Sequence, residues 1–208
     1  MSHRTGPSPM PDTPTTALYA DIDRHFLAPE ALKHAALLGR AGPDAGGWFK
    51  AELAYLLDSL LKADRIKAWR ANAPISEDTS TAVGTGSRQR CDFRIEFADP
   101  SIPQGERGVL WLEVKALADP ARSGPLADSA VFAKGGGFTD DIVKLLRVPD
   151  GDRVVLLFIY PRPDAAQWSE LMSSLARRIA PIDFTETSTV AGYPPDLYVC
   201  KLSVSEGF

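Results

Sequence analysis

The sequence predicts an α/β fold with a mixed central sheet flanked by helices. Along residues 47–160 the hydrophobic patterns indicate one helix, three strands, a second helix and a further strand. The last of these, Arg153–Tyr160, is a continuous apolar run, which is typical of a strand buried on both faces beneath covering helices. A chain of 208 residues that is 44% hydrophobic has the size of one ordinary domain.

The amino-terminal part is expected to be a tail followed by helices. Residues 1–15 are rich in Pro, Ser and Thr, which predicts an extended or disordered tail. Residues 16–46 form a helical segment, with helical apolar spacing over Thr16–Arg40 and a break at Pro29. Residues Gly47–Lys62 again show helical spacing, and Glu52 lies beside the apolar stripe.

Three strands are expected next, at Arg65–Arg70, residues 91–97 and residues 109–117. Side chains alternate between the two faces of a strand. In the second strand this puts Asp92, Arg94 and Glu96 on one face. In the third strand one face carries Trp111, Glu113, Lys115 and Leu117, and the other carries Leu110, Leu112, Val114 and Ala116.

The remainder completes the predicted core and extends it. Residues 118–138 are expected to form a long loop over the site, ending in Lys134 and three glycines. The helix Phe138–Leu146 and the strand Arg153–Tyr160 follow. Residues 161–208 add a helix at Ala165–Ile179 and a strand at Leu197–Val204, which either cover a face of the sheet or make a dimer contact.

The candidate chemistry lies in the second and third strands. Asp92 is in one, and the tripeptide Glu113-Val114-Lys115 is in the next. Charged groups among aliphatic and aromatic neighbours are costly to bury unless a metal, a phosphate or another partner compensates them. Two converging carboxylates can hold a divalent metal, and an adjacent lysine can contact a water or a phosphate oxygen. The alternative is a solvated face of an edge strand.

With this order of elements, residues 47–160 resemble the PD-(D/E)xK, or restriction-endonuclease-like, nucleases. Their core is αβββαβ, with an acid on the second strand and acid-x-lysine on the third. The resemblance implies that Asp92 and Glu113, with the carbonyl of Val114, bind Mg²⁺ or Mn²⁺. It also implies that Lys115 assists the attacking water and that Glu52 matches a helix-borne acid near the metal. Asp92 follows Cys91 instead of the family's Pro.

Charge limits how such a protein would meet nucleic acid. A net charge of −4 is not the signature of a protein that coats nucleic acid non-specifically. Contacts with the expected partner, DNA or alternatively RNA, must therefore be local. The candidates are Arg88, Arg90, Arg94 and Lys134, although ordinary solvated arginines would look the same. A homodimer or a larger complex is left open.

The sequence therefore predicts a metal-dependent nuclease. The alternatives are a catalytically inactive protein of the same fold that acts as a binding or assembly module, and an α/β protein of another fold. No apolar run is long enough to span a membrane and no signal peptide is evident, so a cytoplasmic location is expected. The two cysteines, Cys91 and Cys200, are expected to be buried thiols.

Overall fold

A computed structural model of the chain describes residues 13–41, 46–75, 89–97, 108–118, 126, 131–132, 137–178, 182–190 and 197–206. Its centre is a six-stranded sheet with the strand order β1-β2-β3-β4-β6-β5. The strands are β1 (Ile66–Pro74), β2 (Arg90–Phe97), β3 (Val109–Ala118), β4 (Asp152–Tyr160), β5 (Ile182–Val190) and β6 (Tyr198–Glu206). The sheet is mixed, because β3 and β4 pair in parallel and all other neighbours pair antiparallel.

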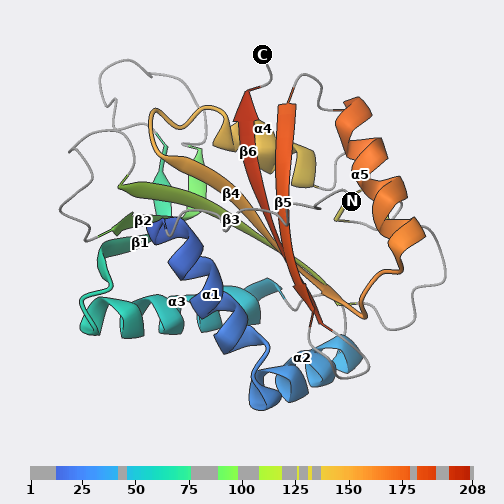
Figure 1. Cartoon of the computed structure of the whole chain (residues 1–208), viewed down its shortest axis with the longest axis horizontal. Helices are drawn as coiled ribbons and strands as arrows, with labels where there is room; N and C mark the ends of the chain where they lie inside the picture. Colours follow the sequence, from blue (N-terminus) through green and yellow to red (C-terminus); the bar gives the residue numbers. More distant parts are fainter. Residues whose placement is uncertain are drawn as a thin grey trace, which may run out of the picture.

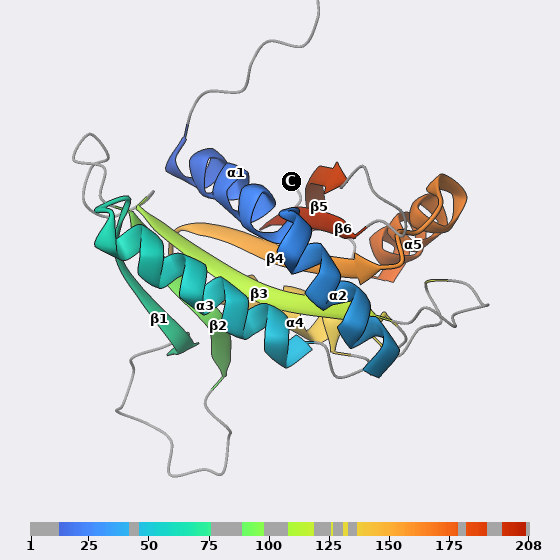
Figure 2. The same cartoon turned by 90° about the horizontal axis from the view of Figure 1, so that it is seen from below.

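Helices cover both faces of the sheet, so the predicted fold class of a mixed sheet flanked by helices is confirmed. On one side lie α1 (Pro14–Phe26), α2 (Pro29–Ala41) and α3 (Gly46–Lys62). On the other side lie α4 (Phe138–Leu145) and α5 (Ala165–Arg178), as Figures 1 and 2 show. The strand β4 is buried from Val154 to Tyr160 between these layers, as its continuous apolar run predicts.

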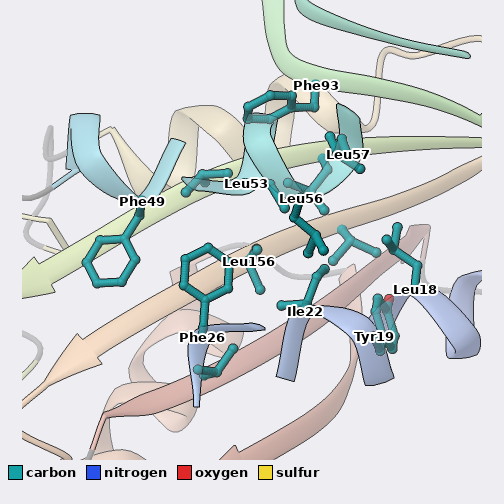
Figure 3. Packing of buried hydrophobic residues seen from close by; sticks show 14 of the residues in the cluster. Leu18, Tyr19, Ile22, Phe26, Phe49, Leu53, Leu56, Leu57, Phe93 and Leu156 are labelled. Carbon is teal, nitrogen blue, oxygen red and sulfur yellow. The ribbon is translucent and has the colours of Figure 1, made fainter. Parts of the chain in front are cut away.

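The first hydrophobic cluster joins α1 and α3 to the sheet. Phe26 of α1 and Phe49 of α3 both contact Phe158 of β4, and the rings of Phe49 and Phe158 stack with centroids 4.2 Å apart. Figure 3 shows the apolar side chains of α1 facing those of α3, with Leu156 of the sheet among them. The amino-terminal helices therefore share one core with the rest of the domain.

The second cluster lies beneath α4 and α5. Leu171 and Leu175 of α5 are buried in it, so this helix covers a face of the sheet. Most of residues 118–138 lie outside the described part of the chain. Three residues of this segment that are described, Leu126, Val131 and Phe132, pack in the second cluster, and Arg178 donates a hydrogen bond to the carbonyl of Phe132 at 2.7 Å. These three residues are therefore part of the hydrophobic core.

The predicted break at Pro29 is found, because it separates α1 from α2. The first helix begins two residues earlier than expected, at Pro14, and a proline is tolerated at the first positions of a helix because its missing N–H has no partner there. The strand β5 is unpredicted, because Ile182–Val190 contains polar and charged residues. Both cysteines are buried free thiols, as expected.

Candidate functional site

The candidate site begins where the antiparallel ladder between β2 and β3 ends. The last paired residues are Phe93 and Leu112, and Asp92 and Glu113 come next. Beyond this point, hydrogen bonds from backbone N–H groups to the side chains of Asp92 and Glu113 connect the two strands. Oδ2 of Asp92 accepts a hydrogen bond from the backbone N–H of Val114 at 2.9 Å, and Oε1 of Glu113 accepts one from the backbone N–H of Asp92 at 3.3 Å. The two predicted acids are thereby held at adjacent positions on neighbouring strands.

Glu113 is the more buried of the two acids. Its side chain is 2% exposed, against 15% for Asp92. Burial and, less strongly, the negative charge of Asp92 together raise the pKa of Glu113 to about 7, although a hydrogen bond from Lys144 opposes them. The carboxyl group therefore titrates near neutral pH.

The helix α4 supplies two of the charged groups around Glu113. Nζ of Lys144 lies 2.7 Å from Oε1 of Glu113 and 3.0 Å from Oδ1 of Asp141. Burial by itself lowers the pKa of Lys144, but the hydrogen bonds and charges of Glu113 and Asp141 outweigh it and raise that pKa overall. Lys144 therefore stays a cation at neutral pH.

Lys115 is held less tightly than Lys144. Its Nζ lies 2.8 Å from Oδ2 of Asp141, yet that oxygen has no partner with hydrogen-bond geometry in the described part of the chain. The same Nζ would be 3.3 Å from a Cβ at Gly137, whose φ of +82° also favours glycine. Glycine at the start of α4 thus lets Lys115 approach.

One further charged group, Lys50, comes from α3 on the other side of the sheet from α4. Nζ of Lys50 in α3 donates a hydrogen bond to Oδ1 of Asp92 at 2.6 Å. We call the six residues the carboxylate–lysine cluster; they are Asp92, Glu113, Asp141, Lys50, Lys115 and Lys144. With all groups ionised, the three acids balance the three lysines.

Glu52 is not a member of this cluster. Its Oε2 lies 3.0 Å from Nε2 of His25 in α1. Two residues along a helix correspond to a turn of about 200° around its axis, so Glu52 faces α1 while Lys50 faces Asp92. The expectation that Glu52 projects into the same cleft was therefore wrong.

The remaining predicted residues are distributed around the site. The Val114 side chain is buried in the first cluster, and its backbone N–H binds Asp92. Arg90 donates to the carbonyl of Asn72 at 2.9 Å. Arg94 pairs with Glu96, and its guanidinium lies 5.5 Å from the ring centroid of Trp111. Arg88 and Lys134 lie outside the described residues.

Sequence reasoning missed Lys50, Asp141 and Lys144. A signal for the α4 pair was present, because positions 141 and 144 are three apart and adjoin the buried positions 138, 142 and 145 on the helix surface. Lys50 similarly adjoins the buried Phe49 and Leu53. Nothing in the sequence says which flank of α3 faces the end of β2.

The donor set suits a hard divalent cation. Mg²⁺ commonly takes one or two carboxylates and keeps several waters, and Asp92 and Glu113 supply two carboxylates. Within the described residues no group of three or more His, Cys, Asp or Glu is arranged to hold a metal. A cation at Asp92 and Glu113 would also have to compete with Lys50 and Lys144 for their oxygens.

Comparisons of the chain with protein-family models, curated proteins and solved structures give no match. In the part of the chain that the structure describes, no helix combines the length and the apolar character needed to cross a membrane.

Proposed function

We propose that the chain is a metal-dependent phosphodiester hydrolase that acts on DNA or RNA. The observation that carries the proposal is the adjacency of Asp92 and Glu113 at the end of the β2–β3 ladder, with Lys115 joined to them through Asp141 and Lys144. Further support comes from the order of the elements. The succession of α3, β1, β2, β3, α4 and β4 has the αβββαβ order of the restriction-endonuclease-like core, with the acid on its second strand and acid-x-lysine on its third.

In this proposal Asp92 and Glu113 hold Mg²⁺ or Mn²⁺. When bound, the ion supplies an activated water and neutralises charge on the phosphate oxygens. Lys144 would have to give up its contact with Glu113 for that carboxylate to hold the ion, and it would keep Asp141, 3.0 Å away, as a partner. Glu113 must be deprotonated for this role, which its pKa of about 7 permits from neutral pH upward.

Lys115 has a separate role in the proposal. Its side chain is 25% exposed, and its contact with Asp141 lacks hydrogen-bond geometry. Turning this ammonium toward a phosphate oxygen or a water would break the ion pair with Asp141, which keeps Lys144 as a partner. A positioned cation that stabilises developing charge contributes a large part of catalysis at such sites.

A binding or assembly module of the same fold is the second candidate. It is favoured by the balance of charge in the carboxylate–lysine cluster, where each carboxylate already has a lysine partner. Such a network can stabilise this end of strands β2 and β3 with no metal at all. Metal binding and cleavage separate the two candidates.

The test is incubation of the protein with plasmid DNA, linear single-stranded DNA and RNA, in Mg²⁺, Mn²⁺ or EDTA. The proposal predicts cleavage of at least one substrate with metal and none in EDTA. Asp92→Asn should abolish it, and Asp58→Asn, which changes a half-exposed acid on α3, should not. If the wild-type protein cleaves none of the substrates with either metal, the module is the better description.

A further inference from the structure

A groove of about 640 Å³ lies on the face of β1 and β2 that does not contact α3. Its lining comes from β1, β2, β3 and the turn after α4, and includes Arg70, Arg94, Trp111 and Arg147. The groove also contains the acids Glu96 and Asp150. It is distinct from the carboxylate–lysine cluster, none of whose residues line it.

The groove and the cluster share two walls. Along β3, Trp111 lines the groove, and Glu113 and Lys115 follow on the same face at a spacing of about 6.6 Å per two residues. Along α4 and its end, Arg147 lines the groove, and Lys144 and Asp141 of the cluster precede it at intervals of three residues. A linear ligand that reaches Lys115 can therefore continue into the groove.

Two of the three arginines have no carboxylate partner among the residues that the structure describes. Arg147 donates a hydrogen bond to the neutral side chain of Gln89 at 3.0 Å. Arg70 is exposed and pairs with no acid among the described residues. Arg94 is neutralised by Glu96 and lies over the Trp111 ring. Three arginines against the two acids Glu96 and Asp150 give the described lining an excess of one positive charge, on a protein whose net charge is −4.

Trp111, which lines the groove, also has a buried donor. Trp111 is 3% exposed, and its indole Nε1–H is buried with no acceptor among the described residues. Buried donors nearly always have a partner, and an ordered water is the ordinary one where the protein supplies none.

We infer that this groove binds the phosphate backbone of a nucleic-acid strand next to the phosphate held at Lys115, with Arg70 and Arg147 as the phosphate contacts. The inference rests on the proposed function, because it takes the strand to be the substrate. A repeating anion fits better than a single one, since the two arginines come from separate elements, β1 and the turn after α4.

The test is fluorescence anisotropy of a labelled single-stranded oligodeoxynucleotide in EDTA, at several salt concentrations. Arg70→Ala/Arg147→Ala should weaken binding on the order of tenfold and should reduce the slope of log K against log salt by about one to two. The matched control, Arg24→Ala/Lys33→Ala, removes two exposed cations from α1 and α2 on the opposite layer and should bind like wild type. Arg70→Lys/Arg147→Lys keeps the charge and should largely retain the slope.

Three results would overturn the inference: no binding by the wild-type protein, equal loss in the groove and control variants, or displacement of the probe by polyglutamate as effective as that by unlabelled oligonucleotide. Cleavage is scored separately. If groove-dependent binding occurs but no substrate is cut with Mg²⁺ or Mn²⁺, the proposed hydrolase fails and the groove stands. If cleavage occurs but binding is unaffected by the groove variants, only the groove fails.

Discussion

Glu113 is a carboxyl group placed where its charge is poorly solvated. It is buried, it lies beside Asp92, and it depends on Lys144 for a compensating cation. Burial together with the charge of Asp92 has a larger effect on its pKa than the lysine does, which is why that pKa rises to about 7. The protein therefore holds a proton on this residue in a pH range where the unfolded chain does not.

This difference predicts how stability depends on pH in EDTA. The pKa of Glu113 is about 7 in the folded protein and about 4.5 as a reference value, so its stabilising contribution is present below pH 4.5 and is lost as the pH rises through 7. The loss should be on the order of 3 kcal/mol, at about 1.4 kcal/mol per pKa unit. Glu113→Gln should lack this loss. Urea unfolding at a series of pH values measures it.

The exposed α5 variant Glu170→Gln is the control for that series, and it should follow the wild-type profile. If Glu113→Gln and the wild-type protein lose stability in parallel between pH 4.5 and 7, Glu113 is not the group that titrates.

Lys144 is expected to compete with a divalent cation for Glu113, because its ammonium occupies Oε1 at 2.7 Å. Lys144→Met removes the competitor and one positive charge, and both changes favour a cation. We expect Mn²⁺ to bind about tenfold more tightly at pH 8, equivalent to about 1.4 kcal/mol. Calorimetric titration of both proteins measures this. Weaker or unchanged Mn²⁺ binding would show that the ion does not use this oxygen.

Among individual residues, the sequence supported the strand-borne groups better than the helix-borne ones. Alternation along β3 puts Glu113 and Lys115 on one face, and both contact α4 in the structure. Because side chains alternate between the two faces of a strand, assigning the strand also fixes which residues share a face. A polar residue beside the apolar stripe of a helix can lie on either side of that stripe, and the sequence does not say which side faces the site. The pattern therefore indicates Glu52, whereas Lys50 makes the contact with Asp92.

At the level of elements, the turn between α4 and β4 depends on one glycine. Gly151 has φ of +84°, and a Cβ there would lie 2.4 Å from the carbonyl oxygen of Val109 in β3. Gly151→Ala should therefore destabilise the protein by about 2 kcal/mol or more, from backbone strain and displacement of β3. Gly108→Ala is the matched control, because a Cβ at that position has open space. Thermal or urea unfolding compares the two, and equal effects would contradict this account of the turn.

The helix α3 packs on the sheet through five buried residues, one of which, Phe49, is aromatic. Phe49 stacks on Phe158 and contacts Phe26, and it is 1% exposed. Phe49→Ala should cost about 3–5 kcal/mol of unfolding free energy. Tyr55→Ala on the same helix should cost well under 1 kcal/mol, because Tyr55 is 68% exposed. Chemical denaturation measures both, and a small effect at Phe49 would contradict the described packing.

The order of most elements was predictable and β5 was not. Strands β1 to β4 and helices α3 to α5 have clear periodicity or continuous apolar runs. The segment Ile182–Val190 mixes Thr, Ser, Asp and Glu with few apolar residues, and it forms a strand at the edge of the sheet through pairing with β6. Pairing with a distant strand is a tertiary effect that a local pattern does not contain.

On the scale of the whole molecule, the sheet brings groups from distant parts of the chain to one place. The antiparallel β2–β3 pair holds Asp92 and Glu113, the parallel β3–β4 pair requires the crossover that includes α4, and α3 reaches Asp92 from the opposite layer. The result is a charge-balanced cluster adjoining a groove with excess arginine, on a protein that is acidic overall. The excess arginine of the groove lies where the proposed substrate would bind.

The rate of metal-dependent cleavage by Lys115→Ala, relative to wild type, tests the central claim most directly. This change leaves Asp92, Glu113 and Lys144 in place, and Asp141 keeps Lys144 as a partner. At saturating Mg²⁺ we expect the variant to remain folded and to bind Mn²⁺ like wild type, but to cleave on the order of 10²-fold more slowly. Wild-type protein that cleaves no nucleic acid, or a variant that cleaves at the wild-type rate, would contradict the assignment of this cluster as a hydrolytic site.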